Sequence, residues 1–151
     1  KGRILTIYYN VAVLFFVTEA FDECLTWINK IIFGEWENIR QDIQDSAKII
    51  QIIVHFELGN VELLESLMRS TRRHLKESNR LYEVESLLLQ LVKKLLRSPG
   101  KKERGNALQA AQLKLQQLIT QSESAVTGTD EVQLWLDSRI KNKKISEIMI
   151  K

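Results

Sequence analysis

Apolar residues recur along almost the whole chain at the period of an α-helix. Residues three or four positions apart lie on one side of a helix, and an apolar side must be buried against a neighbour. One such stripe contains Phe21, Cys24, Leu25, Ile28, Ile31 and Ile32. Two more contain Val61, Leu64, Leu67, Met68, Thr71 and Leu75, and then Leu108, Ala111, Leu115, Leu118 and Ser122. Because no stretch shows sustained alternation of apolar and polar residues, the sequence predicts an all-α protein.

Three segments, 4–17, 46–58 and 81–96, are apolar on more than one side. A helix of this kind must be sandwiched between neighbours, so we expect all three to be enclosed. The β-branched residues of 49–54 would also suit a buried strand. We predict a helix there, because the segment belongs to a long unbroken run with charges at helical intervals.

Composition agrees with a helical protein. One Pro and six Gly among 151 residues are too few for a β-sandwich or a disordered linker, and the length suits one domain. The single cysteine cannot form an intrachain disulfide, so we expect a cytoplasmic location. The apolar run 11–17 is too short to span a bilayer, so no membrane span is expected. The chain begins Lys1-Gly2-Arg3 without Met, which indicates a piece of a longer protein.

Turn residues divide the chain into helical hairpins. Leu58-Gly59-Asn60 has a glycine suited to a helix C-terminus, followed by a good N-cap residue. Pro99 ends another helix, and Thr127-Gly128-Thr129-Asp130 precedes a last one. Short joints favour antiparallel neighbours. We therefore predict one helical-repeat region over 1–151, with hairpins at about 3–33, 38–77 and 80–125 and a terminal helix at about 130–148.

Two of these hairpins show a repeat with an offset of 40 residues, set by Phe21 and Val61. In the first, Val11 and Ala12 form a pair of an apolar and a small residue. The later apolar and small positions are Phe15, Phe21, Cys24, Ile28 and Ile31. These residues resemble the tetratricopeptide repeat family, a helix–turn–helix repeat of about 34 residues. The second hairpin keeps Gly59-Asn60 at the turn but departs from the family at Gln51, Ile52, Leu64 and Thr71, and the third keeps only the stripe.

The resemblance implies a right-handed α-solenoid of stacked antiparallel hairpins, closed by the terminal helix. It also implies a non-catalytic scaffold that binds a peptide or helix of a partner protein in a groove lined by the first helices. Groove candidates on the solvent side of those helices are Tyr9, Asn10, Gln51 and His55. Self-association is a further possibility for such a region.

Charge is unevenly distributed along the chain. Residues 1–68 carry five Lys/Arg against ten Asp/Glu, whereas residues 69–104 carry eleven against four. The basic segment 69–104 could bind an anionic partner, including a nucleic acid, although Tyr82 is its only aromatic residue available for stacking. It could equally form the solvated faces of two helices. A helical module that binds nucleic acid through 69–104 is therefore the alternative function.

Four cations within this segment share one helix face. The candidate partner-binding residues are Arg69, Arg72, Arg73 and Lys76. Such a face could hold an acidic peptide or a C-terminal carboxylate through charge-assisted hydrogen bonds. Alternatively, the four cations could pair with Glu62, Glu65 and Glu77 at helical spacing.

No residue pattern points to catalysis, a metal or a cofactor. His55 and His74 are nineteen residues apart and lack metal-ligand spacing. We expect His55 to be packed in or near the core and His74 to be solvated. Cys24 occupies a small apolar position, which predicts a buried, unreactive thiol. The sequence therefore predicts a protein that is not an enzyme and binds no cofactor or metal.

Overall fold

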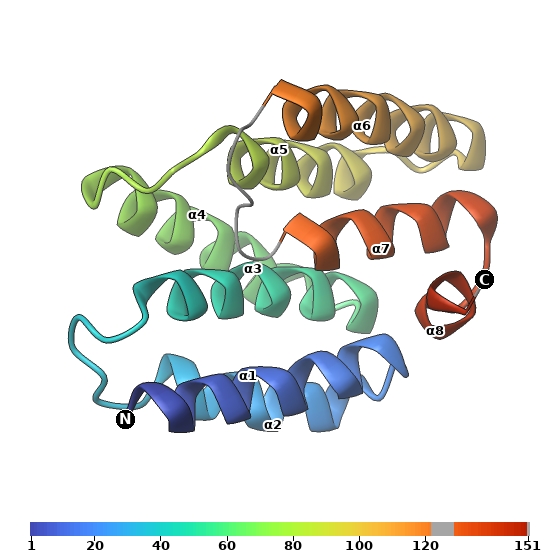
Figure 1. Cartoon of the computed structure of the whole chain (residues 1–151). Coiled ribbons are helices and arrows are strands. Elements are labelled where there is room, and N and C mark those ends of the chain that lie inside the picture. The colour runs from blue at the N-terminus through green and yellow to red at the C-terminus, as the bar shows by residue number, and fades with distance from the viewer. Residues whose placement is uncertain (122–128, 151) are drawn as a thin grey trace.

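The computed structural model describes residues 1–121 and 129–150, and these residues form eight α-helices and no strand. The all-α prediction is confirmed (Figure 1). The helices are α1 (Gly2–Val17), α2 (Phe21–Ile32), α3 (Gln41–Leu58), α4 (Val61–Glu77), α5 (Glu83–Arg97), α6 (Lys101–Gln121), α7 (Thr129–Lys141) and α8 (Ile145–Met149).

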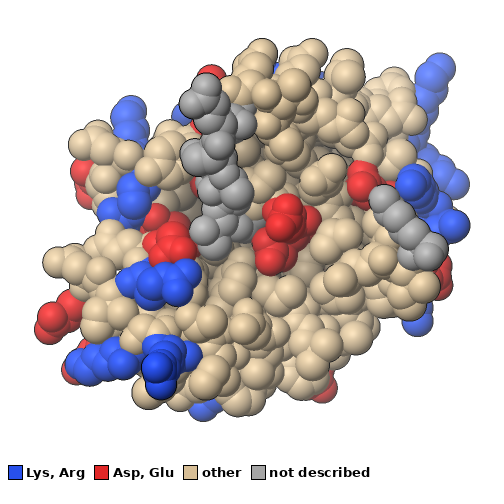
Figure 2. All heavy atoms as spheres, in the orientation of Figure 1, with Lys and Arg blue, Asp and Glu red and all other residues tan. Residues whose placement is uncertain are grey.

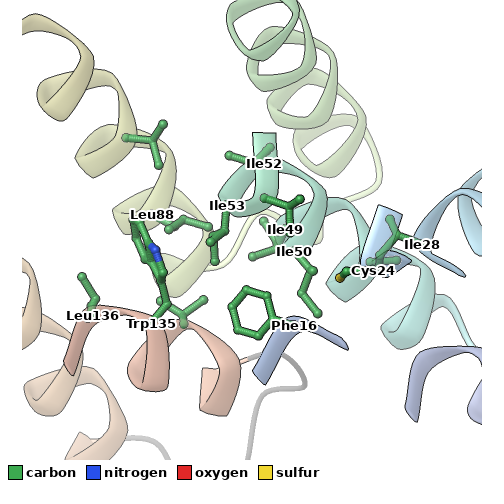
Figure 3. Close-up of a cluster of buried hydrophobic side chains, with 14 of the residues drawn as sticks. Phe16, Cys24, Ile28, Ile49, Ile50, Ile52, Ile53, Leu88, Trp135 and Leu136 are labelled. Carbon is green, nitrogen blue, oxygen red and sulfur yellow. The ribbon is translucent and has the colours of Figure 1, made fainter. Parts of the chain in front are cut away.

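Helix α3 is enclosed by its neighbours. Every residue from Ile49 to His55 is buried, and α1, α2, α4 and α5 all contact this helix. The β-branched segment 49–54 is helical, as predicted, because surrounding helices bury every side of it. Figure 3 shows Ile49, Ile50, Ile52 and Ile53 of α3 pointing to different sides within the core.

The helices with narrow stripes bury little beyond those stripes, and Val61, the first predicted member on α4, is 46% exposed. On α4 the buried residues are Leu64, Thr71 and Leu75, and on α6 the stripe from Leu108 to Leu118 is buried. The last member predicted for that stripe, Ser122, lies outside the described residues. The surfaces of α4 and α6 away from these stripes are exposed.

Helix α1 departs from the prediction that segment 4–17 is enclosed. Leu5, Ala12 and Phe16 are fully buried, but Ile4, Ile7 and Leu14 are 44%, 57% and 61% exposed. The prediction is wrong for this side of α1, because the helices that contact it, α2, α3 and α8, lie on its other sides.

Successive helices lie at successive levels of the molecule. Figure 1 shows α1 and α2 at one end, α3 and α4 in the middle, and α5 and α6 at the other end, with α7 between the levels of α3 and α6. Trp135 of α7 reaches the core beside Ile53 of α3 and Leu88 of α5 (Figure 3). The finer fold, a right-handed solenoid of the tetratricopeptide type, stays a prediction.

The region of the predicted terminal helix contains two helices, α7 and α8. The chain turns between them at Asn142, whose φ of 54° lies in the left-handed region. The end of the third predicted hairpin, residues 122–125, lies outside the described residues, as does the joint Thr127-Gly128.

The joint between α3 and α4 depends on Gly59, as the sequence predicts. Gly59 ends α3 with a φ of 77°, a left-handed conformation that a side chain disfavours. Asn60 precedes α4 at the N-cap position, but its side chain makes no capping hydrogen bond. Its Nδ2 lies instead 3.0 Å from His55 Nδ1, which corrects the prediction of an asparagine cap.

Two glycine substitutions should therefore change stability in opposite directions. We expect Gly59→Ala to lower the free energy of unfolding by about 1 kcal/mol, because a Cβ strains the left-handed backbone. Gly105 lies within α6 with open space around it, so Gly105→Ala should raise that free energy by about 0.5–1 kcal/mol. Urea unfolding followed by circular dichroism measures both. An unchanged or raised stability of Gly59→Ala would contradict the role assigned to the Gly59 backbone.

Candidate partner-binding surfaces

The candidate residues Arg69, Arg72, Arg73 and Lys76 are all exposed and lie on one side of α4. Because successive helical residues are about 100° apart, these four positions fall within a single arc. The buried stripe of α4 occupies the opposite arc. The structure thus brings the four side chains together on a surface that faces solvent, which we call the basic face of α4.

None of these four cations forms an ion pair with a carboxylate in the part of the chain that the structure describes. The alternative prediction, pairing with Glu62, Glu65 and Glu77, is therefore wrong. Those carboxylates are exposed, and no ion pair holds them to the arginines. The charge of the basic face is consequently available to a ligand.

Other cations of segment 69–104 have a structural partner or lie elsewhere. Arg80 Nε donates a hydrogen bond to Asp45 Oδ2 at 2.5 Å, which joins the end of α4 to α3. His74 lies beside this pair, with Nε2 3.9 Å from Asp45 Oδ1. Burial, aided by the charge of Lys48, lowers the pKa of His74. The His74 side chain lies beside this ion pair and is 43% exposed, so it is partly solvated as the sequence predicts.

The face of the molecule in Figure 2 carries no continuous basic stripe. Blue Lys and Arg atoms form separate groups near its margins, and red and tan atoms lie between them. A ligand that follows an extended charged backbone needs cations along its whole path. This face does not offer such a path.

The predicted groove residues do not line an open groove. Tyr9, Gln51 and His55 are only 8%, 6% and 8% exposed, and only Asn10 is on the surface. Gln51 and His55 lie on the side of α3 opposite the one that carries Ser46 and Glu57. The prediction is therefore wrong for these three residues, whereas the expectation of a packed His55 is confirmed.

Helix α7 covers the side of α3 that carries Glu57. Trp135 Nε1 and Arg139 Nε both donate hydrogen bonds to Glu57 Oε1, at 2.7 and 2.6 Å. The Trp135 ring also meets the Phe56 ring edge-on, with 5.9 Å between centroids. Between these two residues of α7, Asp137 accepts a hydrogen bond from Gln112 of α6.

Glu19 extends this polar cluster to the first turn of the chain. Arg139 Nη2 donates to Glu19 Oε1 at 3.0 Å, and the backbone N–H of Ile145 donates to Glu19 Oε2 at 2.8 Å. One arginine thus joins α7 to the joint after α1 and to the end of α3. The hydrogen bonds of this cluster join residues that are 78 to 126 positions apart in sequence, so no local spacing could have revealed the cluster.

Tyr9 lies beneath the N-terminal end of α7. Burial and the negative charge of Glu131 both raise the pKa of its hydroxyl far above the usual value. Burial also raises the pKa of Glu131, with a further contribution from Asp130. These groups are therefore held in a poorly solvated region, where the neutral form of each is favoured.

The described residues contain no constellation suited to metal binding. No group of three or more His, Cys, Asp or Glu side chains among them could hold a metal ion. Cys24 is fully buried, and burial raises the pKa of its thiol to about 12, which confirms the predicted buried thiol. Among the helices described, none is both long and apolar enough to cross a membrane.

Comparisons with protein-family models, with curated proteins and with solved structures found no match for this chain. The resemblance to tetratricopeptide repeats therefore rests on the residues named in the sequence and stays a prediction.

Removing the charge of Arg139 should destabilise the protein, because Glu19 and Glu57 would lose their common cation. Their side chains are only 20% and 17% exposed. We expect Arg139→Met to lower the free energy of unfolding by about 2–3 kcal/mol, the scale for breaking one side of a largely buried pair. Lys141→Met, at an exposed position of the same helix, is the control and should change it by less than about 0.5 kcal/mol. Equal effects of the two substitutions in urea unfolding would exclude this role for Arg139.

Glu85 should make stability depend on pH. Its Oε2 is buried without a hydrogen-bond partner among the described residues, and burial raises its pKa. A carboxyl with a raised folded-state pKa contributes stability at low pH and loses that contribution as pH rises through this pKa.

We therefore expect Glu85→Gln to stabilise the protein at pH 7, with a gain that shrinks as the pH falls through the raised folded-state pKa and levels off below about pH 4. Glu83→Gln, at an exposed position in the same first turn of α5, is the matched control and should show no such pH-dependent gain. Thermal unfolding followed by circular dichroism over this pH range compares the two variants with the unmodified chain. A gain of Glu85→Gln that is independent of pH would contradict the assignment.

Proposed function

We propose that this chain is a non-catalytic scaffold that binds an acidic segment of a partner protein on the basic face of α4. The observation that carries the proposal is that Arg69, Arg72, Arg73 and Lys76 are exposed together and have no carboxylate partner among the described residues. Four positive charges on one helical side repel one another, so an anionic ligand would relieve this repulsion.

The expected ligand is a peptide or helix with several Asp or Glu side chains. Guanidinium groups bind carboxylates through paired, charge-assisted hydrogen bonds, and three of the four cations are arginines. The face also lies in the C-terminal half of α4, where the helix dipole favours positive charge. The scaffold therefore offers its own pre-positioned cations and needs no rearrangement of the core.

Other features support a scaffold over an enzyme. The only thiol, that of Cys24, is buried and its pKa is raised. The two histidines lie apart, His55 at the α3–α4 joint and His74 beside the Asp45–Arg80 pair. The lone buried cysteine also suits a reducing compartment, and we propose a cytoplasmic location. For the finer fold we propose the right-handed solenoid, which is supported by the repeat of Phe21 and Val61 and by the Gly59 turn.

A nucleic-acid-binding module remains the second candidate, favoured by the exposed cations beyond α4. Lys93, Lys94 and Arg97 of α5 and Lys101, Lys102 and Arg104 of α6 are all exposed. A nucleic acid would use these residues together with the basic face, whereas an acidic peptide of a partner would need the basic face alone.

Charge reversal on α4 tests the first candidate directly. We expect Arg72→Glu combined with Arg73→Glu to weaken binding of a fluorescein-labelled Glu-rich peptide by roughly tenfold or more, measured by fluorescence polarisation. The matched control is Lys101→Glu combined with Lys102→Glu, which changes net charge equally on α6 and should leave peptide binding nearly unchanged. Circular dichroism checks that both variants are folded.

The same variants distinguish the second candidate. If the chain binds single-stranded RNA at low salt, if affinity falls steeply with salt, and if both double reversals weaken it alike, segment 69–104 is a nucleic-acid surface. Equal weakening of peptide binding by both reversals would contradict a specific role for the basic face of α4.

A further inference from the structure

One end of the molecule carries an exposed apolar stripe on α1. Its members are Ile4, Ile7, Val11 and Leu14, of which only Val11 is partly covered. On the helix the stripe lies about 180° from Tyr9, whose hydroxyl faces Ser46 of α3. The stripe therefore points away from the rest of the protein, and Figure 1 shows α1 and α2 at the end of the molecule. Contiguous exposed apolar surfaces are typical of interaction sites.

A charged stripe on α2 accompanies it. Trp27 of α2 packs beside Tyr8 of α1, with ring centroids 5.5 Å apart, so this side of α2 borders α1. Glu23 lies one turn before Trp27 and Lys30 one turn after it, on the same side of α2. Both are exposed, and Lys30 Nζ lies 5.6 Å from the centroid of Trp27.

The spacing of the apolar stripe is the same in both directions. Its residues are separated by three, four and three positions, so reversing the helix reproduces the pattern. If two copies meet with their α1 helices antiparallel, Ile4 faces Leu14 of the second copy and Ile7 faces Val11. The two-fold axis then passes the level of position 9 in α1.

The charges on α2 follow the same axis. Tyr8 lies next to that level and contacts Trp27, so the axis also passes near Trp27. Glu23 and Lys30 lie at nearly equal distances on either side of Trp27. The antiparallel arrangement therefore places Glu23 of each copy opposite Lys30 of the other, which is a self-complementary pattern.

The surface shape agrees with this arrangement. A shallow hollow lined by Gly2, Arg3, Thr6, Ile7 and Arg40 flanks the first half of the stripe. The same two-fold operation brings Leu14 of the second copy, the most exposed member of its stripe, to the level of this hollow.

We propose that the α1–α2 end is a homodimer interface that binds a second copy of this chain about a two-fold axis. Among the residues that the structure describes, the opposite end has no comparable surface. Leu113 and Ile119 are exposed on α6, but they are six positions apart and lie on different sides of that helix, among polar residues. Because the interface uses the same surface on both copies, association stops at the dimer and forms no chain of molecules.

The small size of the surface favours a weak dimer. Helix α1 is about 24 Å long, and with one side of α2 it offers less than the roughly 800 Å² per partner of a standard interface. We therefore expect a dimer that dissociates on dilution through the micromolar range.

Sedimentation velocity of the chain across roughly 1–300 μM tests the proposal, and we expect a shift from monomer to dimer over this range. Ile7→Lys should weaken association by roughly tenfold or more, because it buries an unpaired charge near the axis. Leu113→Lys, at an exposed position of the opposite end, should leave association unchanged. A monomer at every concentration would overturn the proposal, even if the stripe binds a different partner. A dimer that is insensitive to Ile7→Lys would overturn it as well.

A charge exchange tests the arrangement of the two copies. Glu23→Lys and Lys30→Glu should each weaken the dimer by roughly three- to tenfold, because each places like charges opposite one another twice. The double variant with both substitutions restores opposite charges in every pair and should recover the original affinity. A double variant as weak as the single ones would exclude the two-fold pairing. Both positions are exposed, and thermal unfolding verifies that the variants remain folded.

Discussion

The enclosure of α3 is the constraint on which the rest of the structure depends. A helix with β-branched and apolar residues on every side is stable in water only when other helices surround it. Here α1, α2, α4 and α5 contact α3, and Trp135 of α7 covers part of its remaining side. The positions of the other helices follow from this requirement, since each turns its own apolar stripe toward α3 or toward a helix that contacts it.

Polar groups on α3 connect this core to distant parts of the chain. Asp45 binds Arg80 beyond the end of α4, and Glu57 binds Trp135 and Arg139 of α7. A carboxylate at the edge of an apolar core is poorly solvated, so it is stabilised by a cation that reaches it from another element. Arg80 and Arg139 are the arginines that serve this purpose, and each is fixed by its contact with a carboxylate of α3. Those of the basic face of α4 have no such partner in the described residues, and this difference separates structural cations from candidate binding cations.

The two ends of the molecule differ in a way that the pattern of a single helix does not reveal. Helix α6 turns a mostly polar side outward, so its end is compatible with water. Helix α1 turns Ile4, Ile7 and Leu14 outward. Burying such side chains is favourable wherever a complementary surface exists, and the stripe on α1 is complementary to itself. Shape and charge are thus the basis of the binding proposed for both surfaces, the basic face of α4 and the α1–α2 end.

The sequence predicted local features well. The period of the apolar residues predicted the helices, and the length of the run around 49–54 correctly outweighed its strand propensity. Gly59 was predicted as a turn residue because few residues other than glycine adopt a left-handed conformation without strain. Cys24 was predicted to be buried because it stands within an apolar stripe. Asn60 shows the limit of this reasoning, since the N-cap position does not dictate whether a side chain caps its helix or contacts a neighbour such as His55.

Spacing over a few residues of the chain determines where helices form and which side of most of them is apolar. Tertiary structure alone decided which apolar sides are covered and which cations find a partner. Segments 4–17 and 46–58 have similar patterns, yet α3 is enclosed and α1 is exposed on one side. Glu19, Glu57 and Arg139 meet only because the chain folds back over 82 to 120 residues. Such contacts depend on the relative placement of whole helices, and no local spacing records that placement.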